Sequence, residues 1–187
     1  ERVAEKLQEE IELCLSQLNL EEAVFQMKID AREEYTPHGR DHVRWEFSSH
    51  SSQTPGALSE RVSGGEISRV LLALKSALAG ADTTSILVFD EIDTGISGEE
   101  ADRVGRVLAD LAEHHQVICI THLPLVAAYA DQHLLIRRED DENRVCVIAE
   151  PLADNERLDE LSRLLSGDEE SDISRKQAKE LLEQTGA

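Results

Sequence analysis

The apolar residues at the start of the chain recur every three or four positions. Between residues 1 and 18 the apolar side chains in this register are Val3, Leu7, Ile11, Cys14 and Leu18. This spacing predicts a helix with one apolar face, close to the seam of a coiled coil. A single surface helix has the same spacing, and a segment this short leaves both alternatives open.

The next segment alternates apolar and polar residues, which predicts two strands, at 24–30 and 42–48. The residues from Glu33 to Asp41 include a proline and a glycine, and we predict that they form the turn between the strands. Residues 48–57 are mostly polar and are predicted to form a loop.

From residue 58 onward the pattern becomes that of an α/β fold. We predict helices at 66–79 and 98–113, a short helix after Pro124, helices at 155–166 and 175–184, strands at 85–89 and 116–121, and a hairpin of strands 132–137 and 144–149. The first two of these strands are continuous apolar runs, which are typical of strands buried on both faces of a sheet.

Three of the helices carry further signals. In the helix at 66–79 the predicted apolar face consists of Ile67, Val70, Leu71, Leu74 and Leu78. In the helix at 98–113 the predicted inward side chains are Ala101, Val104, Leu108 and Leu111. At the last helix, Ser174 and Gln177 have the spacing of a capping box.

Composition and charge are those of a globular protein. The chain has 187 residues, of which 40% are hydrophobic and 31% charged, and no apolar run approaches the roughly 18 residues of a membrane span, so we expect no membrane contact. The formal net charge of −20 repels phosphate backbones. We therefore expect any DNA to be bound mainly through other parts of the protein.

The cysteines indicate a reducing compartment. There are three, an odd number, and they form no CxxC pair. Cys119 and Cys146 lie in apolar runs, which predicts buried, reduced thiols in a cytoplasmic protein.

The first candidate functional motif is Ser63-Gly64-Gly65-Glu66, which opens the helix at 66. Glycines have no Cβ, so a ligand can approach their backbone closely, and the free N–H groups at a helix start favour an anion. Ser63 and Glu66 also have the spacing of a plain capping box, which remains the alternative.

The second motif is the apolar run Ile86–Phe89 followed by Asp90 and Glu91. A buried strand that ends in two acids places them at the carboxyl edge of a sheet, where ligands of α/β proteins bind. There Asp90 can hold Mg²⁺ through water, and Glu91 can orient or deprotonate an attacking water. The alternative is a strand followed by an acidic loop without function.

The third motif is Thr121-His122, at the end of the strand Gln116–Ile120. A histidine at this edge can reach a terminal phosphate and sense its presence. The alternative is a capping or core histidine without a ligand.

The order of the three motifs is the layout of an ABC-type ATPase, with a signature motif, Walker B acids and a switch histidine. The segment from Asp93 to Gly98 then stands where that class has its D-loop. More closely, the chain resembles the RecN family of SMC-like DNA-repair ATPases. The resemblance lies in VSGGEISRVLLALKSAL (62–78), VFDEIDTGISG (88–98) and ICITHLPLVAAYAD (118–131), and it extends from about residue 58 to residue 137.

The resemblance implies an α/β fold, the C-terminal part of an ABC-type P-loop ATPase head with a coiled-coil remnant at its N-terminus. It implies the end of the returning coiled-coil arm at 1–20 and the C-terminal lobe of the head at 21–187. The site residues that it implies are Glu91 and His122 for catalysis, Asp90 for Mg²⁺, and Ser63, Gly64, Gly65, Glu66 and Asp93 for ATP held by a second head.

The partners implied by the resemblance are the N-terminal half of the same head, a second head in an ATP-dependent homodimer, and DNA, in a nucleoid-associated protein. None of the ten glycines is followed by lysine, so the chain lacks the Gly-Lys of a phosphate-binding loop. The chain also starts at Glu1, and we expect a segment that is inactive alone. An ABC transporter half and a non-catalytic dimerisation module remain the alternatives.

Overall fold

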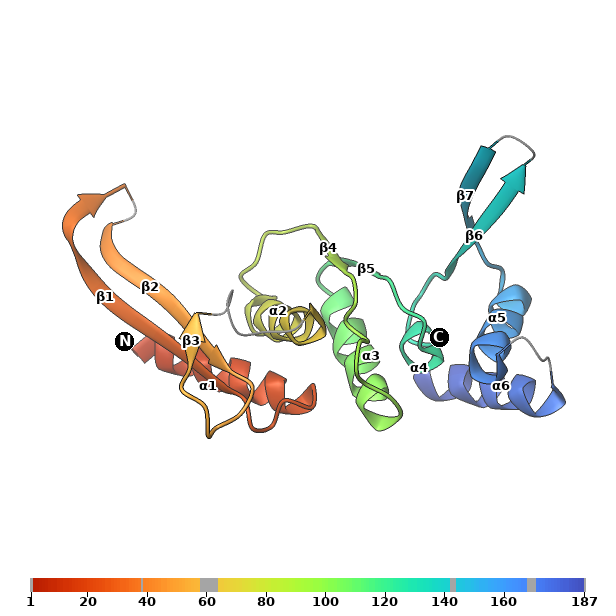
Figure 1. Cartoon of the computed structure of the whole chain (residues 1–187), viewed down its shortest axis with the longest axis horizontal. Coiled ribbons are helices and arrows are strands. Elements are labelled where there is room, and N and C mark those ends of the chain that lie inside the picture. The colour runs from red at the N-terminus through yellow and green to blue at the C-terminus, as the bar shows by residue number, and fades with distance from the viewer. Residues whose placement is uncertain (1, 38, 58–63, 142–143, 168–170, 187) are drawn as a thin grey trace. The chain divides into compact units, whose positions relative to one another are not determined.

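The computed structural model of the chain describes residues 2–37, 39–57, 64–141, 144–167 and 171–186 (Figure 1). They form two compact units, Glu1–Ile120 and Thr121–Ala187, each of which is described by itself. This partition differs from the arm at 1–20 and lobe at 21–187 expected from the sequence, a division that stays a prediction. No helix within the described ranges is long and apolar enough to cross a membrane.

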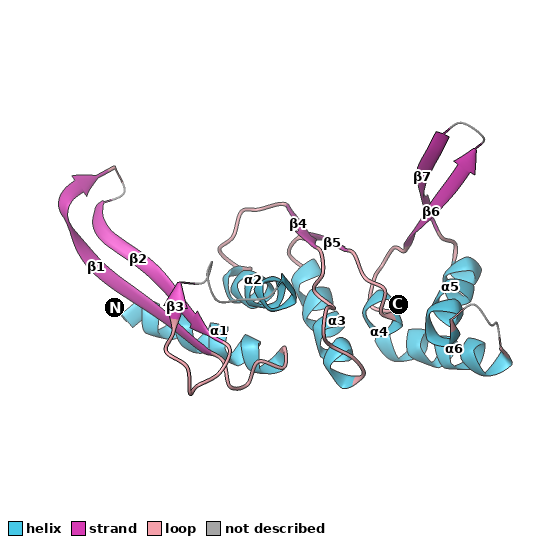
Figure 2. Cartoon of the chain, viewed as in Figure 1, coloured by secondary structure: helices cyan, strands magenta, loops and turns pink. Residues whose placement is uncertain are grey.

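The elements follow the predicted order, except that a short strand, Gly56–Ala57, ends the predicted loop at 48–57 (Figure 2). The first unit contains α1 (Arg2–Gln17), β1 (Val24–Thr36), β2 (Gly39–Ser48), β3 (Gly56–Ala57), α2 (Gly64–Leu78), β4 (Ile86–Phe89), α3 (Glu99–Ala112) and β5 (Gln116–Cys119). The second unit contains α4 (Pro124–Ala127), β6 (Leu134–Asp141), β7 (Arg144–Pro151), α5 (Asp154–Ser166) and α6 (Asp172–Thr185).

Helix α1 packs against α2 and β1 through one face, as its spacing predicts. Ile11 and Leu18 are 0% and 1% exposed, and Leu15 between them is equally buried. At the other end of the helix Val3 is 80% exposed, so the described residues do not cover the apolar face there, and the coiled-coil seam stays a prediction. Burial of the face begins only where the helix meets its neighbours.

Strands β1 and β2 form one long antiparallel hairpin, whose register runs from Val24 opposite Ser48 to Ala31 opposite Asp41. The predicted turn, Glu33 to Asp41, is longer than the observed one, because β1 continues to Thr36 and β2 begins at Gly39. Side-chain contacts extend the pairing: the Thr36 hydroxyl donates to the Gly39 carbonyl oxygen at 2.7 Å. Gly39 has a φ of 94°, which favours glycine.

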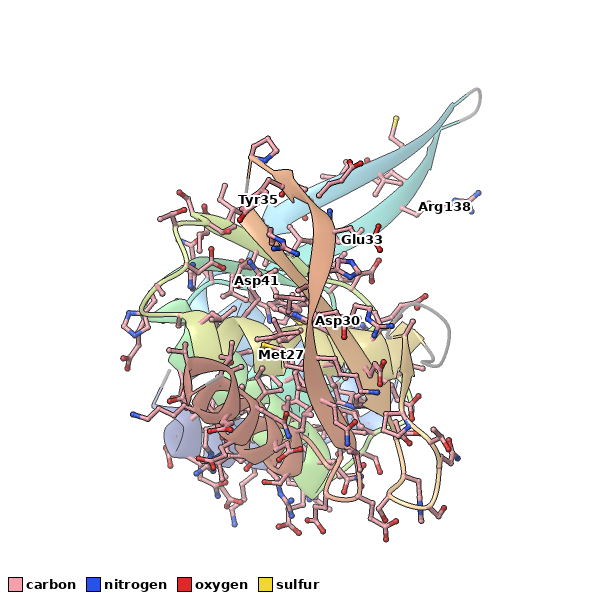
Figure 3. The ribbon with its side chains drawn as sticks, turned by 90° about the vertical axis from the view of Figure 1, so that its left-hand side faces the viewer. Met27, Asp30, Glu33, Tyr35, Asp41 and Arg138 are labelled. Carbon is pink, nitrogen blue, oxygen red and sulfur yellow. The ribbon has the colours of Figure 1, made fainter. Side chains whose placement is uncertain are left out.

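Figure 3 shows this hairpin from its side, with Met27, Asp30, Glu33 and Tyr35 along β1 and Asp41 on β2. The Arg44 guanidinium pairs with the Asp30 carboxylate across the two strands at 2.6 Å. Both side chains are half exposed, so solvent weakens this ion pair. The outer part of the hairpin is therefore held mainly by its backbone ladder.

Strands β4 and β5 pair in parallel, with Ile86 opposite Gln116 and Phe89 opposite Cys119. The prediction that both strands are buried on both faces is wrong. Leu87 and Phe89 are buried, but Ile86 and Val88 are 52% and 59% exposed. Successive side chains of a strand point to opposite faces, and the described residues cover only one face of this two-stranded sheet.

Helix α3 buries its whole predicted face, Ala101, Val104, Leu108 and Leu111. Helix α2 does so only in part, because Val70 and Leu74 are buried whereas Ile67 and Leu71 are 39% and 44% exposed. Ile67 and Leu71 line a cleft of about 590 Å³, which Trp45 of β2 also lines. The spacing of apolar residues in α2 does not by itself distinguish the residues that are buried from those that border this cleft.

The second unit has a small core between α4, α5 and α6. Its buried residues are Ala127, Ala128, Leu161, Ala178 and Leu181. The capping box of α6 is one turn earlier than predicted: Ser171, not Ser174, is the N-cap, and its hydroxyl accepts the N–H of Ser174 at 3.1 Å. Ser174 is buried, and its hydroxyl lies 2.8 Å from that of Ser162, so it joins α6 to α5.

Strands β6 and β7 form the predicted hairpin, with Leu134 opposite Pro151. Its side chains at 134–139 and 146–151 are largely exposed, including that of Cys146, so the prediction of a buried thiol is wrong at this position. Cys14 and Cys119 are half-buried, and none of the three cysteines is in a disulfide.

The imidazole of His133, just before β6, should make the stability of the second unit depend on pH. Its burial lowers the pKa of His133, and the nearby Arg157 lowers it further while Glu160 opposes the shift. The unfolded chain therefore binds the proton more readily than the folded unit. The second unit should have its full stability above about pH 6.5, the pKa of histidine in the unfolded chain. Its stability should fall as the pH drops through and below that value.

We expect amide hydrogen exchange in α5 and α6 to become faster between about pH 7.5 and about pH 5.5, after correction for the intrinsic exchange rate. His133→Gln should reduce that pH-dependence, because glutamine does not titrate. His114→Gln, at an exposed histidine of the first unit, is the matched control. An equal pH-dependence in His133→Gln and the unchanged protein would exclude His133 as its source.

Candidate functional site

Two acids follow β4 directly, where the strand reaches the carboxyl edge of the sheet. One oxygen of the Asp90 carboxylate accepts the N–H of Glu91 at 2.9 Å. Glu91 has a φ of 58°, a left-handed conformation that costs a residue with a side chain about 1–2 kcal/mol. Both carboxylates are exposed, so the chain turns sharply here and presents two acids to solvent.

The start of α2 lies against this turn. A Cβ on Gly64 would stand 2.8 Å from Oε2 of Glu91, and a Cβ on Gly65 would stand 2.8 Å from the backbone oxygen of Thr94. Gly65 therefore needs glycine, because backbone occupies the space of its Cβ, whereas at Gly64 the exposed Glu91 side chain can move aside. The structure thus brings the predicted signature motif and the predicted Walker B acids together.

Two side chains of α2 join the helix to the same turn. The Ser68 hydroxyl donates to the Asp90 carbonyl oxygen at 3.0 Å, and the Arg69 guanidinium donates to the Thr94 carbonyl oxygen at 3.2 Å. Arg69 is only 8% exposed, its Nε has no partner among the described residues, and burial lowers the pKa of its guanidinium. Neither residue belongs to a motif predicted from the sequence, although an arginine on the apolar face of a helix was a signal.

The residues that follow Glu91 in this turn are buried. Ile92 is fully buried and Asp93 is 4% exposed. At the end of the adjacent strand β5, burial raises the pKa of the Cys119 thiol to about 12, with Asp93 and Asp90 as further causes. The Cys119 thiol is therefore protonated at neutral pH, and the carboxyl ends of β4 and β5 meet beside the two acids.

For the other predicted site residues, the structure gives burial or position in the chain. Glu66 is half-buried in the first turn of α2, and Ser63 lies outside the described residues. Thr121 and His122 begin the second unit, and the His122 imidazole is exposed. Because the two units are described separately, the proximity of His122 to Asp90 and Glu91 stays a prediction.

The donor set at the turn fits Mg²⁺ bound through few protein ligands. Asp90 uses one oxygen lone pair for the N–H of Glu91, and the carboxylate has further lone pairs that face solvent. Mg²⁺ keeps several of its waters and takes one or two carboxylates together with substrate phosphates. Within the described ranges no group of three or more His, Cys, Asp or Glu side chains converges as a complete protein site for a metal ion.

The chain is similar along almost its whole length to curated DNA repair proteins. It is 38% identical over 186 residues to RecN of Treponema pallidum, which covers 96% of this chain and 32% of that protein. It is 41% identical over 179 residues to RecN of Rickettsia bellii, with 96% and 32% coverage. It is 35% identical over 196 residues to RecN of Bacillus subtilis, with 97% and 34% coverage. The chain thus spans about a third of the length of these relatives.

Solved structures similar to the chain are heads of SMC proteins. The SMC head domain of Pyrococcus yayanosii has a TM-score of 0.60 at 18% identity and covers 88% of this chain and 30% of that chain. An SMC ATPase studied for ATP-driven dimerization and DNA-stimulated activation has a TM-score of 0.51 at 18% identity and covers 88% of this chain and 94% of that chain. No family model matches the chain. The fold is therefore that of an SMC ATPase head.

Proposed function

This chain is related to RecN DNA repair proteins along almost its whole length and has the fold of an SMC ATPase head, and on that premise we propose that it supplies the C-terminal part of a head that binds and hydrolyses ATP. Two heads hold two ATP molecules between them. The cycle is coupled to DNA binding or tethering in double-strand-break repair. With a net charge of −20, this segment leaves the main DNA contact to other parts of the protein.

The observation that supports this proposal best is the packing of the two motifs against each other. A Cβ added to Gly64 or Gly65 would stand 2.8 Å from an atom of Glu91 or Thr94, so the N–H groups at the start of α2 and the two carboxylates share one edge of the unit. Helix N–H groups favour phosphate, and carboxylates hold Mg²⁺ or a water. A nucleotide phosphate chain needs both kinds of group.

Each residue has a separate role in the proposed site. Asp90 would hold Mg²⁺ through water, and the ion would neutralise charge on the phosphates, while Glu91 orients or deprotonates the attacking water. His122 contacts the γ-phosphate. The residues proposed to act on the nucleotide of the opposite head are Ser63, Gly64, Gly65, Glu66 and Asp93.

Completion of the site requires the N-terminal half of the same head. The chain contains no Gly-Lys pair for the phosphates. One face of the β4–β5 sheet also exposes apolar side chains that a covering layer would bury, namely Ile86, Val88, Ile118 and Ile120. We therefore assign hydrolysis to the completed head and not to this segment alone. A transporter half shares the three motifs, but the relatives named above are DNA repair proteins.

The assignment of Ser63 to the opposite head can be tested in the complete protein, although Ser63 lies outside the described residues. Ser63→Arg places a long side chain beside the helix start, in the gap between two heads. We expect it to abolish ATP-driven dimerisation and hydrolysis while the ATP affinity of a single head stays unchanged, because Asp90 and the phosphate-binding lysine are untouched. ATP binding is measured on monomers, and dimerisation by light scattering.

A mixture of two inactive variants makes the test sharper. Ser63→Arg heads are mixed with heads whose phosphate-binding lysine is replaced. One composite site in each mixed dimer is then whole, so partial hydrolysis should return. Ser52→Arg, in an exposed loop, is the control for the added arginine. Weaker ATP binding by monomeric Ser63→Arg heads would show that Ser63 acts on the nucleotide of its own head.

A further inference from the structure

Both α5 and α6 bind one backbone oxygen at the end of α4. The Arg157 guanidinium of α5 donates to the Ala128 carbonyl oxygen at 2.9 Å. The Thr185 hydroxyl of α6 lies 3.0 Å from the same oxygen and 3.2 Å from the Leu182 carbonyl oxygen, which compete for its one proton. Ala128 itself is fully buried. The end of the short helix α4 is therefore fixed by two side chains from two different helices.

Burial of the Arg157 guanidinium at this position costs free energy. Arg157 is 9% exposed, its Nε has no partner among the described residues, and burial lowers the pKa of its guanidinium, although Asp154 and Asp131 oppose the shift. A buried cation with an unpaired donor costs free energy that an apolar side chain of similar length avoids. Packing of α5 onto the core therefore does not by itself require arginine here.

The segment that Arg157 holds begins at His122. Helix α4 is a single turn, Pro124–Ala127, and the Ala128 N–H donates to the Pro124 carbonyl oxygen at 3.0 Å. On the other side, the Thr121 hydroxyl accepts the N–H of Leu123 at 3.0 Å. His122 thus lies between Thr121, whose hydroxyl binds the Leu123 N–H, and a one-turn helix whose far end is anchored to α5 and α6.

We propose that Arg157 is a positioning residue for His122. By holding the Ala128 carbonyl oxygen, it fixes the place of α4 and with it the direction of the His122 imidazole, and Thr185 assists it. The inference rests on the proposed function, in which His122 contacts the γ-phosphate. Displacement of a reacting group by about 1 Å can cost 10²-fold in rate, so a loosened α4 affects hydrolysis more than binding.

The test uses Arg157→Met in the complete protein, because methionine keeps much of the apolar stem and removes the donors. We expect kcat for ATP hydrolysis to fall by roughly 10-fold or more, with KM for ATP unchanged. Arg157→Lys, which keeps a charged donor group, should retain more of the rate than Arg157→Met. Thr185→Val should give a smaller loss in the same direction. Lys179→Met is the control, because it removes a cation from the neighbouring helix α6 where that side chain and its partner Glu183 are 68% and 67% exposed.

A double-variant cycle separates positioning from a general structural effect. In a His122→Ala background, Arg157→Met should lower kcat no further, because two residues that act through one group are not additive. An equal loss with and without His122 would overturn the inference, as would an unchanged kcat in Arg157→Met when His122→Ala slows hydrolysis. If His122→Ala itself left hydrolysis unchanged, the proposed role of His122 would fail and the inference with it. Hydrogen exchange in α5 and α6 verifies that each variant is folded.

Discussion

Replacement of Glu91 by glutamine should slow ATP hydrolysis by the complete protein by about 10²-fold or more, the loss expected when a general base is removed. Glutamine has almost the same shape as glutamate, so the close contact between the Glu91 side chain and Gly64 is preserved. The left-handed backbone at position 91 is equally strained with either residue. ATP binding should therefore remain, and heads should accumulate as ATP-bound dimers.

Single-turnover hydrolysis and nucleotide binding are measured on the same preparation. Glu113→Gln is the control, since it removes a charge from an exposed position at the end of α3. A Glu91→Gln protein that hydrolyses ATP at the unchanged rate would remove Glu91 from the mechanism. Loss of ATP binding would instead indicate that the Glu91 charge holds the nucleotide or its metal ion.

The order and type of the elements could be predicted from the sequence because periodicity reports which side chains a helix or strand buries. Helix α3 is the clearest case, with all four predicted inward side chains buried. The errors occur where a neighbouring element decides the outcome. Val88 of β4 and Leu71 of α2 are apolar and in phase, yet both are exposed, because no described residue covers their sides.

The candidate site was predictable as a set of motifs but not as a set of contacts. Sequence order placed Asp90 and Glu91 at the end of a strand and Gly64 at the start of a helix, and the structure confirms these local settings. The hydrogen bonds of Ser68 and Arg69 to the acidic turn depend on how that helix packs, which no local pattern encodes. The cap of α6 shows the same limit on a smaller scale, since Ser171 and Ser174 are both suitable residues.

The two glycines of the first motif illustrate how a structural requirement changes an interpretation. Their sequence context indicated close approach of a ligand to the backbone. The structure shows a second reason for glycine, because the space above Gly65 is already occupied by the backbone of residues 91 and 94. The proposed ATP contact of the opposite head and this packing within the chain are compatible, since one uses N–H groups and the other the space that a Cβ would fill.

Gly65→Ala should destabilise the first unit and impair hydrolysis. The new Cβ would stand 2.8 Å from the Thr94 carbonyl oxygen and 3.3 Å from that of Glu91, and backbone atoms cannot move aside as a flexible side chain can. Alanine favours a helix over glycine by about 0.8–1.0 kcal/mol, but forced overpacking costs about 1–3 kcal/mol. We expect overpacking to prevail, with a net loss of up to about 2 kcal/mol in the free energy of unfolding.

Gly80→Ala is the matched control, because a Cβ at Gly80, just after α2, would meet no atom within 4 Å. This variant should leave stability and hydrolysis close to those of the unchanged protein. Chemical denaturation gives the free energy of unfolding, and hydrogen exchange at the start of α2 shows whether the damage is local. If Gly65→Ala were as stable as Gly80→Ala and equally active, the start of α2 would not be packed against the acidic turn. Since that packing is the observation on which the proposed site rests, the site would then have to be assigned elsewhere.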